Sequence, residues 1–325
     1  MSARIAQVAQ TGGPERIHWH DVELPPPGPG EARVRNTAVG LNFIDIYHRS
    51  GIYPIDLPGA LGVEGAGVVE AVGAGVTGVR PGDRVAYFGP DRGAYATARN
   101  MAAAALFVLP ADIDAELAAA VLLKGCTAEF LVRRCARVEA GWPVLVHAAA
   151  GGVGMILTQW LKAVGATVIG TVGSEAKAAL AREAGADHVI RYDREGIADR
   201  VRALTGGAGV RVTFDGIGAA TWEASLDATG KRGLIVGYGN ASGPVTGVAT
   251  GVLALKGSLY TTRPMLYDYY AAPEERNEGT AALWDMIRSS KVCVTIGQRY
   301  PLEDAARAHR DLAARATHGS SLLIP

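Results

Sequence analysis

One short stretch of the sequence, from Pro143 to Leu161, constrains the fold more than any other. It begins with the apolar run Val144 to Val146, of the kind that fills a strand buried on both faces. Small residues follow at once, with Ala149, Gly151 and Gly154 at the three spacings of the fingerprint G-x-G-x-x-G. Apolar residues then recur at helical spacing. The stretch therefore predicts a strand, a tight turn and a helix.

This turn predicts a dinucleotide site. Small residues let the backbone turn tightly and approach a pyrophosphate, which sits at the N-terminus of the following helix. Free N–H groups and the positive end of the helix dipole favour an anion there. A tight packing turn is the alternative interpretation, but the position between a buried strand and an amphipathic helix favours the cofactor. The cofactor-binding residues predicted here are Ala149, Gly151, Gly152, Val153 and Gly154.

Length and composition limit the class of protein. With 325 residues, 49% of them hydrophobic, the chain is expected to form about two domains. Lys plus Arg and Asp plus Glu both number 32, and this balance argues against nucleic acid or an anionic membrane as a partner. Cys126, Cys135 and Cys293 fit the reduced thiols of a cytosolic protein. There is no secretion signal and no apolar run of membrane-spanning length, so a cytoplasmic protein is expected.

The sequence pattern changes along the chain from β-rich to alternating. Short β-type runs separated by Gly and Pro, one of them Ala94 to Thr97, extend to about residue 110 and suggest a barrel-like β domain. From Trp142 onward, six strand candidates with helices in most gaps describe an α/β fold with a doubly wound parallel sheet. The run Ser320 to Ile324 is expected to return as a strand to the first domain. The predicted domains are residues 1–124 plus 265–325 and an inserted domain of residues 125–264.

The end of the second strand of the alternating part indicates which dinucleotide binds. An NAD site usually has an acid there for the ribose 2′-hydroxyl. This sequence has Gly173 and Ser174 instead, and Glu175 falls inside the next helix, where the helix dipole alone explains an acid. Gly173 and Ser174 offer N–H and hydroxyl donors, and Lys177 adds a cation one turn further on. The combination favours the 2′-phosphate of NADPH; the alternative is that Lys177 is only a solvated helix residue.

Several further motifs stand outside the glycine-rich turn. They are Asn42-Phe43-Ile44-Asp45, Gly62-Val63-Glu64-Gly65-Ala66-Gly67, Pro81-Gly82-Asp83-Arg84-Val85, Gly185-Ala186-Asp187 and Gly257-Ser258-Leu259-Tyr260. Together with the turn, these motifs resemble the medium-chain dehydrogenase/reductase superfamily, and within it the zinc-free NADPH:quinone oxidoreductases. The resemblance implies a Rossmann domain inserted in a β-rich GroES-like catalytic domain.

The departures from the zinc enzymes of that superfamily define the expected chemistry. Those enzymes have a cysteine at the position of Asn42 and a histidine at the position of Val63, and neither residue present here is a zinc ligand. The stretch from Asp83 to Met101 also lacks the cysteines of their structural zinc lobe. No metal site is therefore expected. Without a Lewis acid, the acceptor has to be electrophilic by itself, as a quinone, an enal or an enone is.

The resemblance implies roles for further residues. It places Asn42, Tyr47 and Tyr53 in the cleft between the domains, as hydrogen-bond donors to the acceptor; for the two tyrosines the alternative is an ordinary half-buried aromatic. Asp45 is expected to orient its neighbours or to cap a helix or turn. Arg263 is expected to support substrate or phosphate, or to hold a dimer contact.

The cofactor residues implied in the same way lie in the alternating part of the chain. They are Thr127 facing the nicotinamide, Tyr192 near the adenine and the 2′-phosphate, and Tyr238 and Asn240 along the nicotinamide half. For Tyr192 the alternative is an aromatic packed at a strand end. His147, inside the first strand, is expected to be a hydrogen-bonded core residue rather than an acid.

These expectations lead to one main function and two alternatives. The main one is an NADPH-dependent, metal-free quinone reductase, acting by hydride or single-electron transfer. A reductase of α,β-unsaturated aldehydes and ketones on the same scaffold is the first alternative. A non-catalytic NADPH-binding protein with a structural or RNA-binding role is the second, although the zero net charge disfavours RNA. The resemblance also implies a homodimer through the strand near Gly257 to Thr261.

Overall fold

The computed structural model describes residues 1–325 and divides them into two compact units. The first unit comprises residues 1–123 and 294–325, and the second residues 124–293. The boundary falls within helix α2 (Ala115–Glu129). Residues 265–293, which the sequence assigned to the β-rich domain, belong to the second unit, where the Tyr270 hydroxyl donates to Glu129 Oε2 at 2.8 Å.

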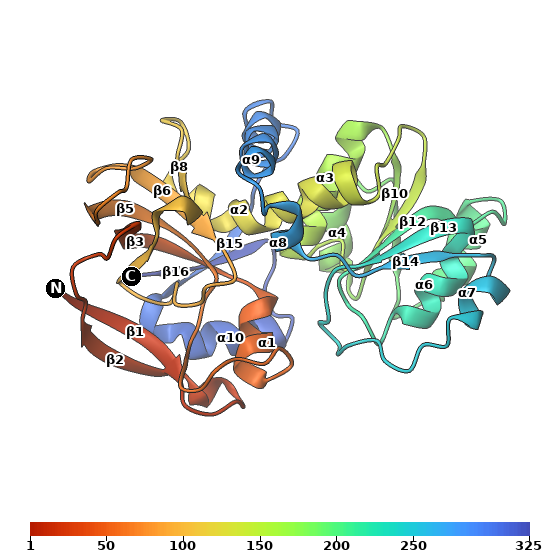
Figure 1. The fold of residues 1–325 in the computed structure, drawn as a ribbon. Helices are drawn as coiled ribbons and strands as arrows, with labels where there is room; N and C mark the ends of the chain where they lie inside the picture. The colour runs from red at the N-terminus through yellow and green to blue at the C-terminus, as the bar shows by residue number, and fades with distance from the viewer. The chain divides into compact units, whose positions relative to one another are not determined.

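The first unit contains two β-sheets (Figure 1). The smaller sheet has the strand order β2-β1-β4, and the larger has the order β15-β16-β3-β5-β6-β8 with β7 also paired to β3. Two helices, α1 (Phe43–Ser50) and α10 (Ala305–Ala313), belong to the same unit. The strands are β1 (Ser2–Val8), β2 (His18–Glu23), β3 (Glu31–Leu41), β4 (Gly59–Ala60), β5 (Glu64–Val72), β6 (Arg84–Phe88), β7 (Ala98–Ala102), β8 (Leu106–Val108), β15 (Ile296–Pro301) and β16 (Ser320–Ile324).

Two sequence predictions for this unit have opposite outcomes. The C-terminal strand is confirmed, because β16 pairs antiparallel with β3. The strand expected at Ala94 to Thr97 is wrong, and the strand in this region is β7. The backbone of the expected segment is bonded elsewhere: Tyr95 N donates to Leu61 O, and Ala6 N donates to Tyr95 O. The antiparallel ladder with β3 starts only at Ala98.

The second unit is a six-stranded parallel sheet in the order β11-β10-β9-β12-β13-β14. This is the strand order of a doubly wound dinucleotide-binding sheet, so the predicted fold class is confirmed. Helices α3 and α4 cover one face, and α5 and α6 cover the other (Figure 1). The elements are β9 (Pro143–Val146), α3 (Gly152–Val164), β10 (Thr167–Val172), α4 (Glu175–Glu183), β11 (His188–Arg191), α5 (Ile197–Leu204), β12 (Val210–Asp215), α6 (Trp222–Ala228), β13 (Thr229–Gly237), α7 (Gly251–Leu255), β14 (Tyr260–Thr262), α8 (Leu266–Tyr269) and α9 (Pro273–Arg288).

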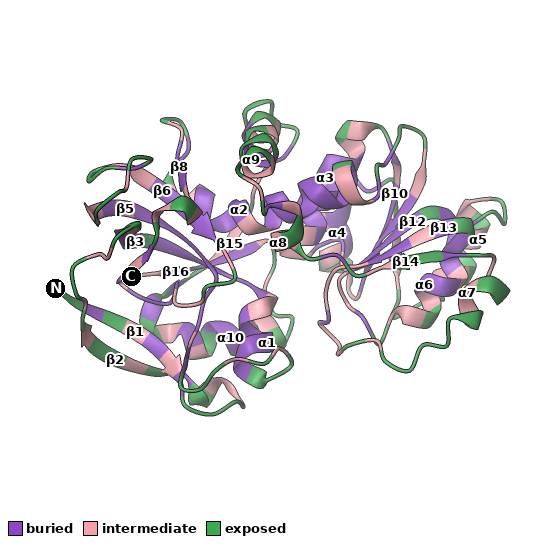
Figure 2. Cartoon of the chain, in the orientation of Figure 1, coloured by how far each residue is buried: buried purple, intermediate pink, exposed green.

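Local sequence signals fix the ends of the helices in this unit. Helix α3 ends at Gly165, whose φ of 91° is the left-handed conformation that glycine adopts without a Cβ clash. Helix α4 begins after Ser174, whose Oγ accepts a hydrogen bond from Lys177 N at 3.3 Å. The central strands β9, β10 and β12 are largely buried, as Figure 2 shows for β10 and β12. No helix is both long and apolar enough to cross a membrane.

Parallel pairing has one consequence for the position of a site. Because all six strands run in the same direction, their carboxyl ends meet at one edge of the sheet, which is where open α/β sheets bind their ligands. The residues that immediately follow these ends are His147 to Gly151 after β9, Gly173 and Ser174 after β10, Tyr192 after β11, Gly216 to Gly218 after β12, Tyr238 to Asn240 after β13 and Arg263 after β14.

Candidate dinucleotide and acceptor sites

The turn between β9 and α3 is as tight as its sequence predicts. Gly151 N donates to Ala148 O at 2.8 Å, and Ala149 N donates to Thr171 O at 3.1 Å. Gly154 packs against this turn so closely that an added Cβ would lie 2.1 Å from Ala148 O. A side chain at this position is sterically excluded, which is the role of the third glycine in a dinucleotide fingerprint. The turn is therefore shaped for close backbone approach.

The end of β10 brings together the residues predicted to bind a 2′-phosphate. A Cβ at Gly173 would lie 2.3 Å from the hydroxyl oxygen of Tyr192, so the tyrosine lies directly over the glycine backbone. Tyr192 is 46% exposed, unlike an aromatic that only fills a core. Lys177 is half-buried one turn into α4. The Gly173 backbone, the Ser174 hydroxyl and the Tyr192 phenol thus lie at one strand end, with Lys177 following in the first turn of α4.

Glu175, in the first turn of α4, is hydrogen-bonded to two arginines. Its carboxylate oxygens accept from Arg182 and Arg191, each at 3.1 Å. These hydrogen bonds lower the pKa of Glu175. The acid therefore forms ion pairs at the surface, in the first turn of α4.

The ends of β12 and β13 form two turns in contact. Asp215, the last residue of β12, accepts at Oδ1 from Ile217 N at 2.8 Å and Gly218 N at 3.0 Å. The ring of Tyr238 covers Gly216, where an added Cβ would lie 2.9 Å from ring atoms. Asn240 follows in the second turn and is buried. Two of the residues implied for the nicotinamide half therefore lie together at this edge.

Two further predicted residues also belong to the second unit. Thr127 is buried near the end of α2, and Arg263 directly follows β14. The Arg263 Cδ would lie 3.8 Å from a Cβ built on Gly237, at the end of the neighbouring strand. Arg263 therefore stands beside the turn that carries Tyr238.

His147 is the core histidine that its position in the sequence predicts. The residue is fully buried, its Nδ1 lies 3.1 Å from Thr171 Oγ1 and its Nε2 lies 3.1 Å from Ser225 Oγ. Burial lowers the pKa of His147, against the raising effect of Asp215. The imidazole is therefore neutral at neutral pH, and the prediction of a hydrogen-bonded core residue is confirmed.

In the first unit, Asn42 and Asp45 hold the start of α1. Asn42 N donates to Asp45 Oδ2 at 2.9 Å, so the carboxylate caps the helix. The Asn42 amide nitrogen donates to Glu64 Oε2 at 2.8 Å and contacts Gly40 O at 3.4 Å. Both amide hydrogens therefore have acceptors within the unit. The capping role foreseen for Asp45 is present in the structure.

A second buried histidine is linked to this cap. Tyr95 OH donates to Asp45 Oδ2 at 3.1 Å, and His309 Nε2 lies 2.9 Å from the same hydroxyl. Since the tyrosine has one hydroxyl hydrogen, His309 Nε2 is the donor in the second contact. Burial, with a smaller effect of Arg49, lowers the pKa of His309 to about 3. No sequence motif indicates these hydrogen bonds, because Asp45, Tyr95 and His309 are far apart in the sequence.

The two tyrosines implied for the acceptor lie against each other. The ring centroids of Tyr47 and Tyr53 are 5.1 Å apart with an edge-to-face angle of 63°. Tyr53 N donates to Tyr47 O at 3.1 Å, which fixes the loop after α1. The ring of His48 is 6.2 Å from Tyr53. Burial and the positive charge of Arg92 lower the pKa of His48 to about 4, so this ring is neutral too.

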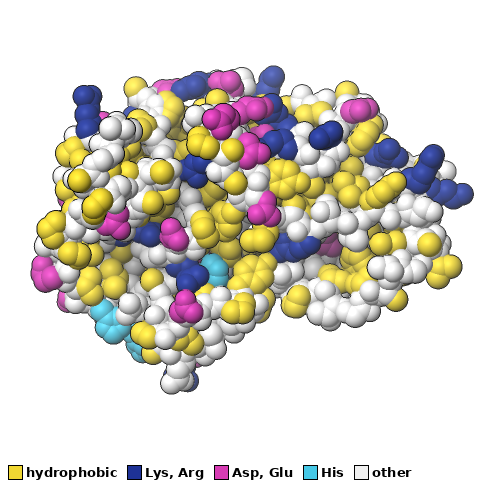
Figure 3. Space-filling model, viewed as in Figure 1, with side chains coloured by type: hydrophobic (Ala, Val, Ile, Leu, Met, Phe, Trp, Pro, Cys, Tyr) yellow, Lys and Arg dark blue, Asp and Glu magenta, His cyan; other side chains and the backbone are white.

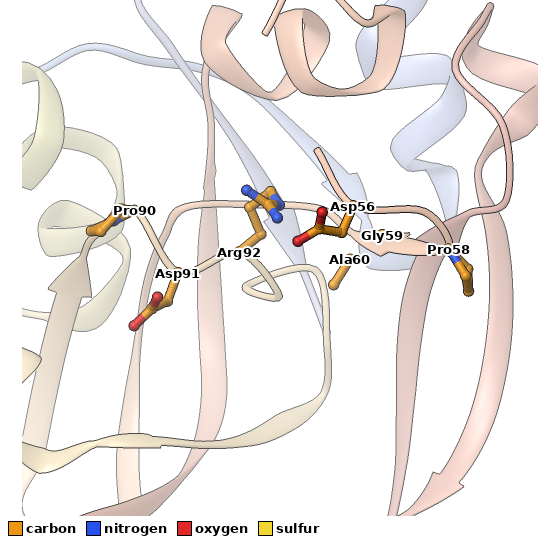
Figure 4. Close-up of a pocket in the computed structure, with 7 residues that line it drawn as sticks. All are labelled: Asp56, Pro58, Gly59, Ala60, Pro90, Asp91 and Arg92. Carbon is orange, nitrogen blue, oxygen red and sulfur yellow. The ribbon is translucent and has the colours of Figure 1, made fainter. Parts of the chain in front are cut away.

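A small cavity opens in the same unit (Figure 4). Its volume is about 300 Å³, and its polar lining comes from Asp56, Asp91 and Arg92. The carboxylate of Asp56 points toward the Arg92 guanidinium in Figure 4. Asp56 follows Tyr53 by three residues along the chain. A charged hollow therefore lies in the segment that follows the aromatic pair.

The residues at the zinc-ligand positions of related enzymes do not form a metal centre. Asn42 is hydrogen-bonded to Glu64, and Val63 is buried. No group of three or more His, Cys, Asp or Glu side chains is placed to hold a metal ion.

The surface in Figure 3 carries basic and acidic side chains on the same face.

Comparisons with known proteins agree with this architecture. Residues 28–138 match the alcohol dehydrogenase GroES-like domain, and residues 152–272 match the zinc-binding dehydrogenase family. The chain is 51% identical to a quinone oxidoreductase of Pseudomonas aeruginosa, and the match covers 100% of both chains. It is 42% identical to a 2-haloacrylate reductase of a Burkholderia species, and that match covers 98% of both chains. Its fold matches the Escherichia coli quinone oxidoreductase solved in complex with NADPH, with a TM-score of 0.97, 47% identity, and coverage of 99% of this chain and 100% of that one.

The full-length identity and the two domain matches agree with the resemblance found in the sequence. The chain belongs to the quinone oxidoreductase branch of the medium-chain dehydrogenase/reductase superfamily.

Proposed function

We propose that this protein is an NADPH-dependent quinone reductase that works without a metal ion. The observation that carries the proposal is the cluster at the end of β10, where Tyr192 lies over Gly173 beside Ser174 and Lys177. Its donors and its cation suit a phosphate on the ribose. The solved relative from Escherichia coli was crystallised with NADPH, which supports the same cofactor here.

The cofactor fits the carboxyl edge of the parallel sheet. A Cβ at Gly154 would collide with Ala148 O, so the start of α3 packs directly on the turn after β9. We assign the pyrophosphate to the N-terminus of α3. The residues proposed to hold the cofactor are Ala149, Gly151, Gly152, Val153 and Gly154 for the pyrophosphate, Gly173, Ser174, Lys177 and Tyr192 for the adenosine 2′-phosphate, and Thr127, Tyr238 and Asn240 for the nicotinamide side. Arg263 is proposed to support the substrate or a phosphate.

In this proposal the residues of the first unit act on the acceptor. Bound NADPH supplies the hydride, and a quinone delocalises the negative charge that it gains. Tyr47 and Tyr53 are the proposed hydrogen-bond donors to that developing oxyanion, and their rings offer flat surfaces to a planar acceptor. Asn42 and Asp45 position α1, which carries Tyr47, through the capping interactions.

A reductase of activated alkenes is a second candidate. The 42% identical relative is named 2-haloacrylate reductase, and an acrylate is an α,β-unsaturated acid. Hydrogen-bond donors placed for a quinone oxygen also suit the carbonyl of an enone or enal. A cytoplasmic location is proposed with either activity, because all three cysteines are free thiols.

Steady-state oxidation of NADPH tests the function. The purified protein is assayed with 1,4-benzoquinone, 1,2-naphthoquinone, a 2-alkenal and an enone, after metal analysis by mass spectrometry. Quinone turnover without stoichiometric zinc is expected. Turnover of the alkenal and enone alone would replace the first candidate by the second, and tight NADPH binding without any turnover would rule out both.

Removing the Lys177 ammonium tests the assignment of the 2′-phosphate. Lys177→Ala is expected to weaken NADPH binding about tenfold, the size expected for a charge-assisted contact with phosphate. NADH binding, measured by the same fluorescence titration, should change less than about twofold. Lys231→Ala is the matched control, because this exposed lysine lies on β13 away from its carboxyl end. Equal losses for NADPH and NADH would contradict the assignment.

We propose further that two copies join through β14. This strand is the last in the sheet and pairs only with β13, so its outer backbone groups are open. Large apolar side chains are exposed around it: Leu255 at 89%, Tyr260 at 63% and Met265 at 55%. An open edge flanked by exposed apolar groups is typical of a two-fold interface.

Light scattering on a size-exclusion column tests the dimer. Wild type is expected to elute as a dimer, and Leu255→Glu combined with Tyr260→Glu as a monomer, because the two charges would be buried without partners. Leu57→Glu places the same charge on a 44% exposed leucine of the first unit and should leave the dimer intact. A monomeric wild type would refute the proposal.

A further inference from the structure

A chain of four buried polar side chains crosses the sheet beneath the proposed cofactor edge. Thr171 on β10, His147 after β9, Ser225 on α6 and Asp215 at the end of β12 are all at most 3% exposed. The three contacts that link them measure 3.1, 3.1 and 2.8 Å. The chain thus connects three neighbouring strands and a helix.

Asp215, the hydrogen-bond acceptor at one end of these four residues, fixes the direction of every hydrogen bond between them. Asp215 as a carboxylate only accepts, so Ser225 uses its single hydroxyl hydrogen on Asp215 Oδ2. Ser225 Oγ therefore accepts from His147 Nε2–H. The His147 Nδ1 lone pair then accepts from the Thr171 hydroxyl. This order requires the neutral Nε2–H tautomer of His147, and the lowered pKa of the buried ring agrees with it.

Asp215, whose orientation is fixed by Ser225, also holds the turns after β12 and β13. Besides Ser225, its carboxylate accepts from the backbone N–H groups of Ile217 and Gly218 and from Thr221 Oγ1. Its backbone oxygen accepts from Tyr238 N at 2.8 Å. The orientation of one carboxylate therefore sets the turn after β12, and the turn after β13 packs on it through the Tyr238 ring.

We infer that His147 is a positioning residue for the nicotinamide side of the cofactor site, acting through Ser225 and Asp215 on the turns at residues 216–218 and 238–240. The inference rests on the proposed function for the identity of the ligand, but the role of His147 in holding the turns does not. His147 itself is fully buried beneath them. It acts by keeping Ser225 oriented toward Asp215.

The structure offers two substitutions with matched controls. Ser225→Ala breaks the link to Asp215 and leaves the His147 Nε2–H without an acceptor. Thr171→Val removes the hydrogen bond to Nδ1. The control for the first is Ser320→Ala, a buried serine of the other unit whose Oγ donates to Ala120 O at 2.7 Å. The control for the second is Thr158→Val, because Thr158 is fully buried in α3 and its hydroxyl has no partner.

Binding of NADPH is measured by fluorescence titration. Ser225→Ala and Thr171→Val are each expected to raise the Kd about tenfold, since a buried polar group loses its partner in each. The double variant should lose about tenfold as well, not a hundredfold, because both changes break one chain. Both controls should stay within about twofold of wild type. Equal affinities of Thr171→Val and Thr158→Val would overturn the inference.

Two readouts do not depend on bound cofactor or on turnover. Nitrogen-15 chemical shifts of the wild-type imidazole should report the Nε2–H tautomer of His147. A protonated or Nδ1–H ring would refute the assigned direction of the hydrogen bonds. Amide hydrogen exchange of residues 238–240 in the free protein should be faster in Ser225→Ala and unchanged in Ser320→Ala. Unchanged exchange in Ser225→Ala would refute the positioning role even if quinone turnover succeeds. Absence of turnover with these two results as expected would refute only the proposed function.

Discussion

Gly154→Ala is expected to abolish NADPH binding at concentrations that saturate the wild type. The new Cβ would lie 2.1 Å from Ala148 O and 3.0 Å from Ala149 Cα, both backbone atoms that cannot rotate away. Relief requires α3 to move off the turn, which removes its N-terminus from the proposed pyrophosphate position. We expect the Kd to rise at least about a hundredfold and the free energy of unfolding to fall by about 2–4 kcal/mol.

Fluorescence titration and urea unfolding measure the two effects. Gly251→Ala is the matched control, because Gly251 begins α7 in the same unit and a Cβ there meets nothing within 4 Å. The control should bind NADPH like the wild type and unfold within about 0.5 kcal/mol of it. Binding by Gly154→Ala within about threefold of the wild type would show that the turn does not hold the pyrophosphate.

Acid is expected to destabilise the protein through His309. The pKa of this buried ring is lowered from 6.5 to about 3, so folding favours its neutral form. The contribution to stability is therefore complete above about pH 6.5 and is lost as the pH falls through 6.5 toward 3. Between pH 7.5 and pH 4.5 the free energy of unfolding should fall by roughly 3 kcal/mol from this residue alone.

Urea unfolding of His309→Gln across the same pH range isolates that contribution. The variant should be less stable at pH 7.5, because Tyr95 loses its donor, but its stability should depend less on pH by about the same 3 kcal/mol. His20→Gln removes a solvent-exposed histidine and should keep the wild-type dependence. If His309→Gln and the wild type had parallel profiles, the buried ring would not be the acid-sensitive group.

The parallel sheet was predictable because its signals are local. Strands β9 and β10 are short apolar runs, β13 ends in one from Leu234 to Gly237, and turn residues follow the strand ends. The groups at Gly173, Ser174 and Lys177 could be located in the same way, since strand direction alone brings them to the carboxyl edge. The strand expected at Ala94 to Thr97 failed because β pairing depends on the partner: Tyr95 bonds to Leu61, which no local propensity reveals.

The features of the site that the sequence did not predict depend on contacts between residues far apart in the chain. Helix α1 has only eight residues, and its cap is held by Tyr95 from another part of the chain. Asn42 is hydrogen-bonded to Glu64, 22 positions away, and His147 to Ser225, 78 positions away. The role of Asp215 could have been predicted from the sequence, because this acid ends a strand and is followed by Gly216 and Gly218. An acid before such a flexible turn often caps its backbone N–H groups.

The anchoring of α1 bears on how such enzymes diverge. The chain from His309 through Tyr95 to Asp45 enters the helix at its first turn, whereas Tyr47 and Tyr53 lie at its middle and beyond its end. Substitutions at the two tyrosines therefore leave the fixed end of the helix untouched. Under the role proposed for these rings in holding the acceptor, exchanging them would change the acceptor preference while the anchored start of the helix stays the same.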